Sequence, residues 1–216
     1  GGGPASRETP LLDPRAASIG IHALVLSGGS AFALDAAGGV MRYLEERDIG
    51  FDVGVTRVPL VCQSCVFDLA IGRKDVRPDA AMAYQACLNA RRDTAEEGCV
   101  GAGTGCTVGK CRGADFAMKS GLGTYAVRNG DLCVGAIVAV NAMGDIYDID
   151  TGKQLAGLRD EDGSGLRSSE EFIYAMEVQK AAGYAANTTI GAIVTNAAFD
   201  KSKMGKIAAM AHNGFA

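Results

Sequence analysis

Few residues of this chain have the chemistry of a catalytic base. The only histidines are His22, inside an apolar run, and His212, in a predicted C-terminal helix. Neither has the sequence surroundings expected of a Ser-His-Asp or Cys-His arrangement. The segment Ser27-Gly28-Gly29-Ser30 also lacks the G-x-S-x-G turn that exposes the nucleophile of many serine hydrolases. A nucleophilic enzyme built on this chain would therefore need a base other than histidine.

The run Asn187-Thr188-Thr189 offers one. If the Asn187–Thr188 bond were cut, Thr188 would begin a new chain and carry its own α-amino group. That amine has an ordinary pKa of about 8 and reaches the threonine Oγ directly or through water. The same tripeptide is also typical of a turn before a strand, because the β-branched run 190–195 follows it. Both interpretations stay open on these residues alone.

The glycine-rich segment 98–110 is a second candidate site. It ends in Gly109-Lys110, but Thr104 stands where a phosphate-binding P-loop needs glycine, and Cys111 stands where that loop needs Ser or Thr. The segment also misses the G-x-G-x-x-G spacing of dinucleotide-binding turns by one residue. We therefore expect its backbone to approach another group closely, without nucleotide binding.

Composition excludes several classes of protein. The net charge of -4 over 216 residues gives no footprint for nucleic acid or an anionic membrane. The apolar run 134–140 is far shorter than the ~20 residues that span a bilayer. Seven cysteines, an odd number, indicate a reducing compartment, so we expect a cytoplasmic protein. Cys62-Gln63-Ser64-Cys65 has no second ligand pair, and we expect no metal.

Local patterns predict a mixed α+β fold with antiparallel pairing rather than a doubly wound parallel sheet. The pair Asn129-Gly130 predicts a hairpin. We expect strands at 21–26, 51–55, 123–128, 132–141 and 190–195, helices at 30–47, 78–91 and 201–212, and loops over 1–14 and 150–169.

Several motifs, taken together and in order, resemble the DmpA-type P1 peptidase family. This is peptidase family S58, the L-aminopeptidase/D-esterase group that includes the nylon-oligomer hydrolases. The likeness covers essentially the whole chain. The motifs are Val25–Phe32, Val100–Gly105, Gly109-Lys110, Val140–Ala142, Asn187–Ala197 and Met210–Gly214.

The resemblance implies a four-layer αββα sandwich, similar to ornithine acetyltransferase and to N-terminal nucleophile hydrolases. It implies a single domain over residues 1–216 that cuts itself between Asn187 and Thr188, giving an α chain that ends at residue 187 and the start of a β chain, residues 188–216. Thr188 is then the nucleophile, Asn141 an oxyanion-stabilising side chain and Lys110 an active-site polar group. No metal or organic cofactor is implied. The expected substrates are peptides or small amides and esters, and the expected assembly is a homo-oligomer.

The sequence departs from the family pattern in two respects. Phe67 stands where some relatives place a tyrosine whose hydroxyl faces the site. Family members also begin earlier than Gly1 and continue beyond Ala216 with a segment that contributes acidic residues to the catalytic centre. The resemblance therefore implies that the chain is truncated at both ends.

Two other functions stay open. One is acyl transfer of the ornithine acetyltransferase type, which also uses a self-released threonine but passes the acyl group to an amine instead of water. The other is an uncleaved, non-catalytic binding or assembly module. Product analysis with an added amine separates the first from hydrolysis, and a gel that shows one band or two tests the second.

Overall fold

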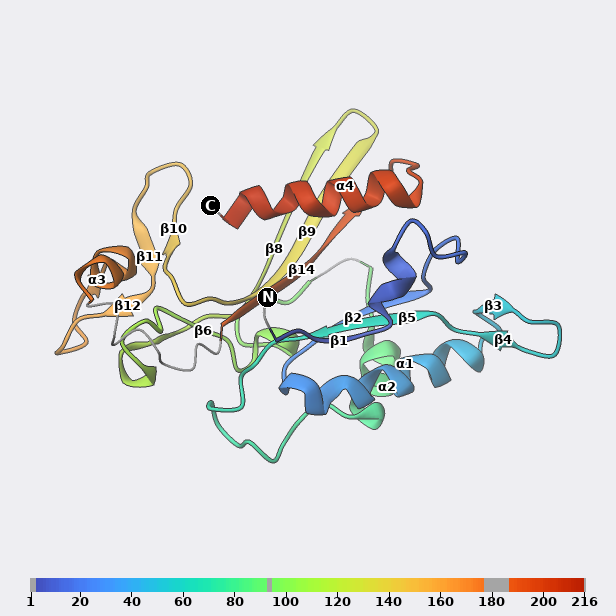
Figure 1. The fold of residues 1–216 in the computed structure, drawn as a ribbon, viewed down its shortest axis with the longest axis horizontal. Coiled ribbons are helices and arrows are strands. Elements are labelled where there is room, and N and C mark those ends of the chain that lie inside the picture. The colour runs from blue at the N-terminus through green and yellow to red at the C-terminus, as the bar shows by residue number, and fades with distance from the viewer. Residues whose placement is uncertain (1–2, 93–94, 177–186, 216) are drawn as a thin grey trace.

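Two three-stranded sheets form the centre of the protein, with helices on their outer sides (Figure 1). The structure is a computed structural model that describes residues 3–92, 95–176 and 187–215. Helices and strands are mixed along the chain, as the sequence predicts. The two sheets meet near the glycine-rich segment, and this meeting place holds the candidate site.

The first sheet has the order β1-β5-β2, with β1 at Ala5–Arg7, β5 at Val61–Cys65 and β2 at Ala23–Ser27. Strand β2 runs parallel to β5, whereas β1 is antiparallel to it. The expectation of a loop over 1–14 is therefore wrong for Ala5–Arg7. This short segment has no hydrophobic periodicity, and it becomes a strand because its backbone pairs with the edge of β5, which is a tertiary effect.

Helices α1 (Ala36–Glu45) and α2 (Ala80–Asn89) pack on each other beside this sheet. Their approach is close: a Cβ on Gly39 would collide with the Ala80 carbonyl. The side chain of Asp79 caps α2 by accepting a hydrogen bond from Met82 N. The predicted helix from residue 30 begins as a 3-10 helix, Ser30–Asp35, before α1. Their common core is Ala36, Ala37, Val40, Leu44, Val61 and Ala83.

The second sheet has the order β14-β9-β8 and is antiparallel throughout. Its strands are β8 (Leu122–Asn129), β9 (Leu132–Asn141) and β14 (Thr188–Thr195). The predicted hairpin between β8 and β9 is confirmed, with Gly130 at φ 59° in the turn. Helix α4 (Lys201–Ala211) lies along the outer side of this sheet (Figure 1).

The region that follows β9, up to residue 176, is more regular than the sequence suggests. The expectation of a loop over 150–169 is wrong for β11 to β13, which lie within it. These segments form short antiparallel strand pairs, which their polar sequences do not indicate. The remaining elements are β3 (Phe51–Asp52), β4 (Arg57–Val58), β6 (Thr107–Val108), β7 (Met118–Lys119), β10 (Ile146–Tyr147), β11 (Gln154–Ala156), β12 (Leu158–Arg159), β13 (Leu166–Arg167), α3 (Ser169–Ala175) and the 3-10 helices Thr9–Leu12, Gly101–Gly103, Ala114–Phe116 and His212–Phe215.

A second buried cluster joins the two sheets. Val66, directly after β5, packs with Cys106 of the glycine-rich segment and with Ala139 and Ile190 of the antiparallel sheet. The glycine-rich segment is therefore packed against both sheets, next to the ends of β5 and β9. Among the described residues, no helix has the length and apolar character needed to cross a bilayer.

Candidate active site

Strand pairing places Thr188 directly opposite Asn141. They are register partners at one end of the β14–β9 ladder. Opposite residues of an antiparallel pair point to the same face of the sheet, with Cβ atoms about 4.5–5.5 Å apart. Asn141 is only 1% exposed, and Thr188 is partly buried. The residue that follows the predicted cut is therefore held beside a buried amide.

The Asn141 side chain is fixed by hydrogen bonds at both ends. Its Oδ1 accepts from Lys110 Nζ at 2.7 Å and from Thr107 N at 3.1 Å. Its Nδ2 donates to the Phe67 carbonyl oxygen at 2.6 Å. Two donors on one side and a carbonyl on the other define which end of the amide carries the N–H groups. Asn141 is thus presented as a rigid N–H donor.

Lys110 reaches this amide from the end of the glycine-rich segment. Its Nζ also donates to the backbone oxygen of Asn141 at 3.0 Å. Burial lowers the pKa of Lys110 from 10.5 to about 8, although the nearby Cys106 opposes the shift. Near neutral pH most molecules carry the ammonium form, but the neutral amine is far more populated than for a solvated lysine.

Backbone contacts hold the Lys110 segment against the chain that leaves β9. Gly109 N donates to the Gly144 oxygen at 2.8 Å, and Lys110 N donates to the Met143 oxygen at 2.9 Å. Gly109 adopts φ 67°, and a Cβ there would collide with the backbone of Gly157. Glycine at this position therefore permits the close approach that the sequence predicts for this segment.

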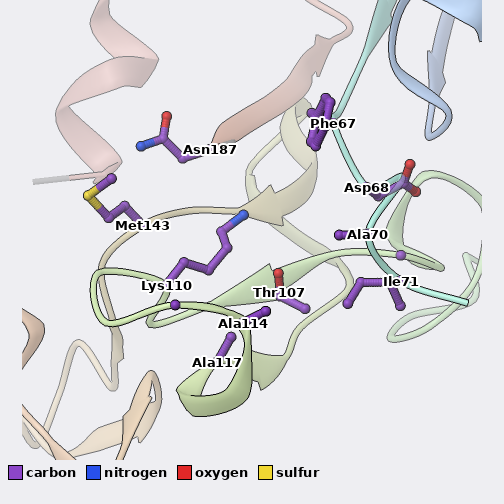
Figure 2. A pocket seen from close by; sticks show the side chains of 12 residues that line it. Phe67, Asp68, Ala70, Ile71, Thr107, Lys110, Ala114, Ala117, Met143 and Asn187 are labelled. Carbon is purple, nitrogen blue, oxygen red and sulfur yellow. The ribbon is translucent and has the colours of Figure 1, made fainter. Parts of the chain in front are cut away.

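A cavity of about 290 Å³ opens beside these residues (Figure 2). Figure 2 shows the Lys110 side chain rising from its loop toward the end of β9, with Asn187 and Met143 to one side and Phe67 to the other. Most of the wall is apolar or small. The lining residues are Phe67, Asp68, Ala70, Ile71, Gly105, Thr107, Lys110, Gly113, Ala114, Ala117, Met143 and Asn187. The cavity thus adjoins both the predicted cut and the Lys110–Asn141 pair.

The structure brings together the four predicted site residues, Lys110, Asn141, Asn187 and Thr188. Sequence reasoning missed Asp68 and Thr107. Asp68 Oδ1 accepts from Gly29 N at 2.7 Å, and its carboxylate occupies the space that side chains on Gly28 and Gly105 would fill. Asp68 contacts glycines that are far from it in the sequence, so no local sequence pattern predicts its position.

Two features to which the sequence assigns no catalytic role have structural contacts. His22 Nδ1 accepts from Leu60 N at 3.0 Å, next to the β2–β5 pair. Cys65 lies buried beside Ser27, whose Oγ donates to its sulfur at 3.1 Å. Within residues 3–92, 95–176 and 187–215, no group of three or more His, Cys, Asp or Glu side chains is arranged to hold a metal ion.

Comparison with known proteins identifies the class. The sequence model of peptidase family S58 matches residues 1–216. The chain belongs to peptidase family S58.

Curated relatives carry names of the same kind. The uncharacterized aminopeptidase Rv1333 of Mycobacterium tuberculosis is 39% identical over 223 residues, which cover 100% of this chain and 62% of the relative. The 6-aminohexanoate-oligomer endohydrolase of Agromyces sp. is 30% identical over 220 residues, covering 97% of this chain and 61% of that enzyme. The chain therefore spans less than two thirds of the length of these relatives. The crystal structure of the PH0078 protein from Pyrococcus horikoshii OT3 is 20% identical, with a TM-score of 0.49, over 80% of this chain and 42% of that one.

Proposed function

We propose that the protein is a self-processing amidohydrolase whose nucleophile is Thr188, freed by cleavage of the Asn187–Thr188 bond. Its substrates are the N-terminal residues of peptides, or related small amides and esters. The observation that carries the proposal is the register pair Thr188–Asn141, with Lys110 Nζ bound to the same amide. Family membership and the names of the relatives support the reaction class.

Self-cleavage begins with attack of Thr188 Oγ on the Asn187 carbonyl carbon. The hydroxyl proton passes to a neutral amine, and Lys110 is the candidate because its lowered pKa makes the neutral form accessible. The C–N bond then breaks as the Thr188 nitrogen takes up a proton, which leaves an ester between the Asn187 carbonyl and Thr188 Oγ. Water hydrolyses this ester. The products are a new carboxylate on Asn187 and a free α-amino group on Thr188.

Substrate hydrolysis repeats the same chemistry with the new amine as base. Thr188 Oγ attacks the substrate carbonyl, and its proton moves to the α-amino group and on to the leaving amine. Water then hydrolyses the acyl ester left on Thr188 Oγ, which releases the acid and restores the hydroxyl. The tetrahedral oxyanion accepts an N–H of Asn141 Nδ2. A preorganised donor of this kind contributes about 3–4 kcal/mol of transition-state stabilisation. The Lys110 ammonium, by binding Asn141 Oδ1, increases the positive charge on that N–H group.

The cavity suggests the kind of acyl group that fits. Its apolar wall, which includes Ile71, Ala114 and Ala117, favours a small or unbranched apolar group next to the scissile bond. Linear ω-amino acid oligomers belong in the substrate panel as well, because the Agromyces relative is named for them.

The architecture and assembly belong to the same proposal. Two contacts support the αββα order: α4 packs on β14, and Val66, which directly follows β5 of the first sheet, packs with Ile190 of the second. We treat residues 1–216 as one domain, with 1–187 and 188–216 on either side of the cut, and we expect a homo-oligomer. Light scattering after size-exclusion chromatography measures the assembly.

Turnover of aminoacyl p-nitroanilides, measured with and without an added amine such as ornithine, tests the reaction. We expect hydrolysis by the wild type, none by Thr188→Ala and near-normal turnover by the neighbouring control Thr189→Ala. Transfer of the acyl group to ornithine with little hydrolysis would show an acyltransferase instead. Turnover by Thr188→Ala equal to that of the wild type would reject Thr188 as the nucleophile.

A further inference from the structure

We infer that Asp145 is a positioning residue for Lys110: its carboxylate holds the 157–158 backbone behind Gly109-Lys110 and so sets where the Lys110 amine lies. The inference deepens the proposed function and rests on it, since it concerns the residue that we place against Asn141. Two observations carry it. Several hydrogen bonds meet at the Asp145 carboxylate, and Gly109 and Gly157 allow the backbones around them to approach closely.

The Asp145 carboxylate accepts hydrogen bonds from two segments that follow it in the sequence. Oδ1 accepts from Leu158 N at 2.9 Å and from Ser169 Oγ at 2.6 Å, and Oδ2 accepts from Ser169 N at 2.7 Å. Leu158 is 1% exposed and Ser169 is 2% exposed, so these donors are withdrawn from water. Hydrogen bonds to an ionised acceptor are roughly twice as strong as neutral ones. One side chain thus fixes both ends of the 157–169 region to the chain just after β9.

Gly157 and Gly109 allow the stack to form. A Cβ on Gly157 would collide with Asp145 Oδ1, and a Cβ on Gly109 would collide with the Gly157 carbonyl carbon. The order is therefore the Asp145 carboxylate, the Gly157–Leu158 backbone and then the Gly109-Lys110 backbone. Lys110 N also donates to the backbone oxygen of Met143, two residues before Asp145.

The Gly109-Lys110 backbone thus contacts two stretches of chain, 143–144 and 157–158, which Asp145 joins. Met143 and Gly144 accept the N–H groups of residues 110 and 109, while the Gly157–Leu158 backbone lies directly against Gly109. If the Asp145 bonds are weakened, the 157–158 backbone is free to withdraw. The Lys110 amine then moves relative to Asn141 and gains access to water.

Asp145→Asn is the variant that tests the inference, and Asp148→Asn is its matched control. Asp148 lies three residues away, and its Oδ1 accepts from Thr151 N at 2.8 Å and from Thr151 Oγ1 at 2.7 Å. Both variants thus remove one negative charge and weaken one set of local hydrogen bonds. Only Asp145 is joined to the Lys110 segment.

Turnover is the first readout. We expect kcat of Asp145→Asn to fall about 10-fold or more with KM within about 2-fold, because displacement of a catalytic group by about 1 Å costs up to about 10²-fold. Asp148→Asn should keep wild-type kcat. Ser169→Ala removes one donor only and should lie between, and Ser169→Thr, which keeps the hydroxyl, should restore turnover. These two variants keep the test available if Asp145→Asn does not fold.

The second readout does not depend on catalysis. Acetylation of Lys110 by acetic anhydride at a series of pH values, followed by peptide mass spectrometry, measures the pKa of its amine. We expect a midpoint of about 8 in the wild type and one nearer 10.5 in Asp145→Asn. An unchanged midpoint and kcat in Asp145→Asn, or equal changes in Asp148→Asn, would overturn the inference. Wild-type turnover by Lys110→Met would instead reject the proposed role of Lys110, and the labelling would still decide on Asp145.

Discussion

Replacing Lys110 by methionine should change how the stability of the protein depends on pH. Burial lowers the pKa of Lys110 from 10.5 to about 8 in the folded protein. Between these two values the unfolded chain binds more protons than the folded one, so the free energy of unfolding rises with pH. Below the folded value both states are protonated, and the folded state bears the full penalty of a buried charge. That penalty is at most about 3 kcal/mol, because Lys110 is only partly buried and water screens its charge.

The size of the effect over an accessible range follows from the two pKa values. From about pH 7 to about pH 9, the Lys110 contribution to the free energy of unfolding should rise by up to about 1.3 kcal/mol, the value for the full pKa shift without solvent screening. Lys110→Met lacks this contribution. The wild type should therefore gain up to about 1.3 kcal/mol on the variant over that interval. Cys106, whose pKa burial raises to about 11, acts in the opposite sense, but mainly above its ordinary 9.0, where this interval ends.

Urea unfolding followed by circular dichroism provides the measurement. Both proteins should carry Thr188→Ala, so that a single uncut chain unfolds and the two-state treatment applies. The quantity compared is the difference between the two free energies at each pH. If the two proteins change in parallel across the interval, Lys110 does not titrate with a lowered pKa, and the placement of its amine against Asn141 would be wrong.

Three further variants test other contacts of the fold and the site. Asn141→Ala should lower kcat by about 10²–10³-fold, the usual loss for an oxyanion donor, and wild-type turnover would remove that role. Gly109→Ala places a Cβ at φ 67° against the Gly157 backbone, so it should cost about 1–2 kcal/mol of unfolding free energy and lower turnover; an unchanged urea midpoint would refute the close contact. Lys201→Met removes an ammonium held by three backbone carbonyls at 3.0 Å, and should lower the unfolding free energy by about 1–3 kcal/mol. The exposed control Lys203→Met should change it by less than about 0.5 kcal/mol, and an equal loss in both would contradict the role of Lys201.

Local sequence patterns predict the elements that carry their own signals. The hairpin of β8 and β9 follows from Asn129-Gly130 between two strand-like runs, and the helix expected at 201–212 corresponds to α4. The short strands β11 to β13 escape prediction because each has only two or three residues, within a polar stretch. Strand β1 escapes prediction because its partner, β5, lies far along the chain. Pairing of this kind depends on tertiary contacts and leaves little trace in a short window of sequence.

The candidate site likewise contains some residues that the sequence predicts and others that only the structure reveals. The choice of Thr188, Asn141 and Lys110 comes from the family resemblance, and the structure brings the three together through one register pair and one side-chain hydrogen bond. Their roles remain predictions. Asp145 has no signal, since its donors come from residues 13 and 24 positions later along the chain. The density of glycine in segment 98–110 predicts close approach, but only the structure shows which backbone Gly109 meets.

The most direct test of the central claim is the mass of the purified protein and the first residue of each fragment. We predict two fragments in the wild type, with the second beginning at Thr188. We also predict one intact chain for Thr188→Ala and wild-type cleavage for Thr189→Ala. An intact wild-type chain, or the same two fragments from Thr188→Ala, would contradict the claim that Thr188 cuts its own chain to become the nucleophile.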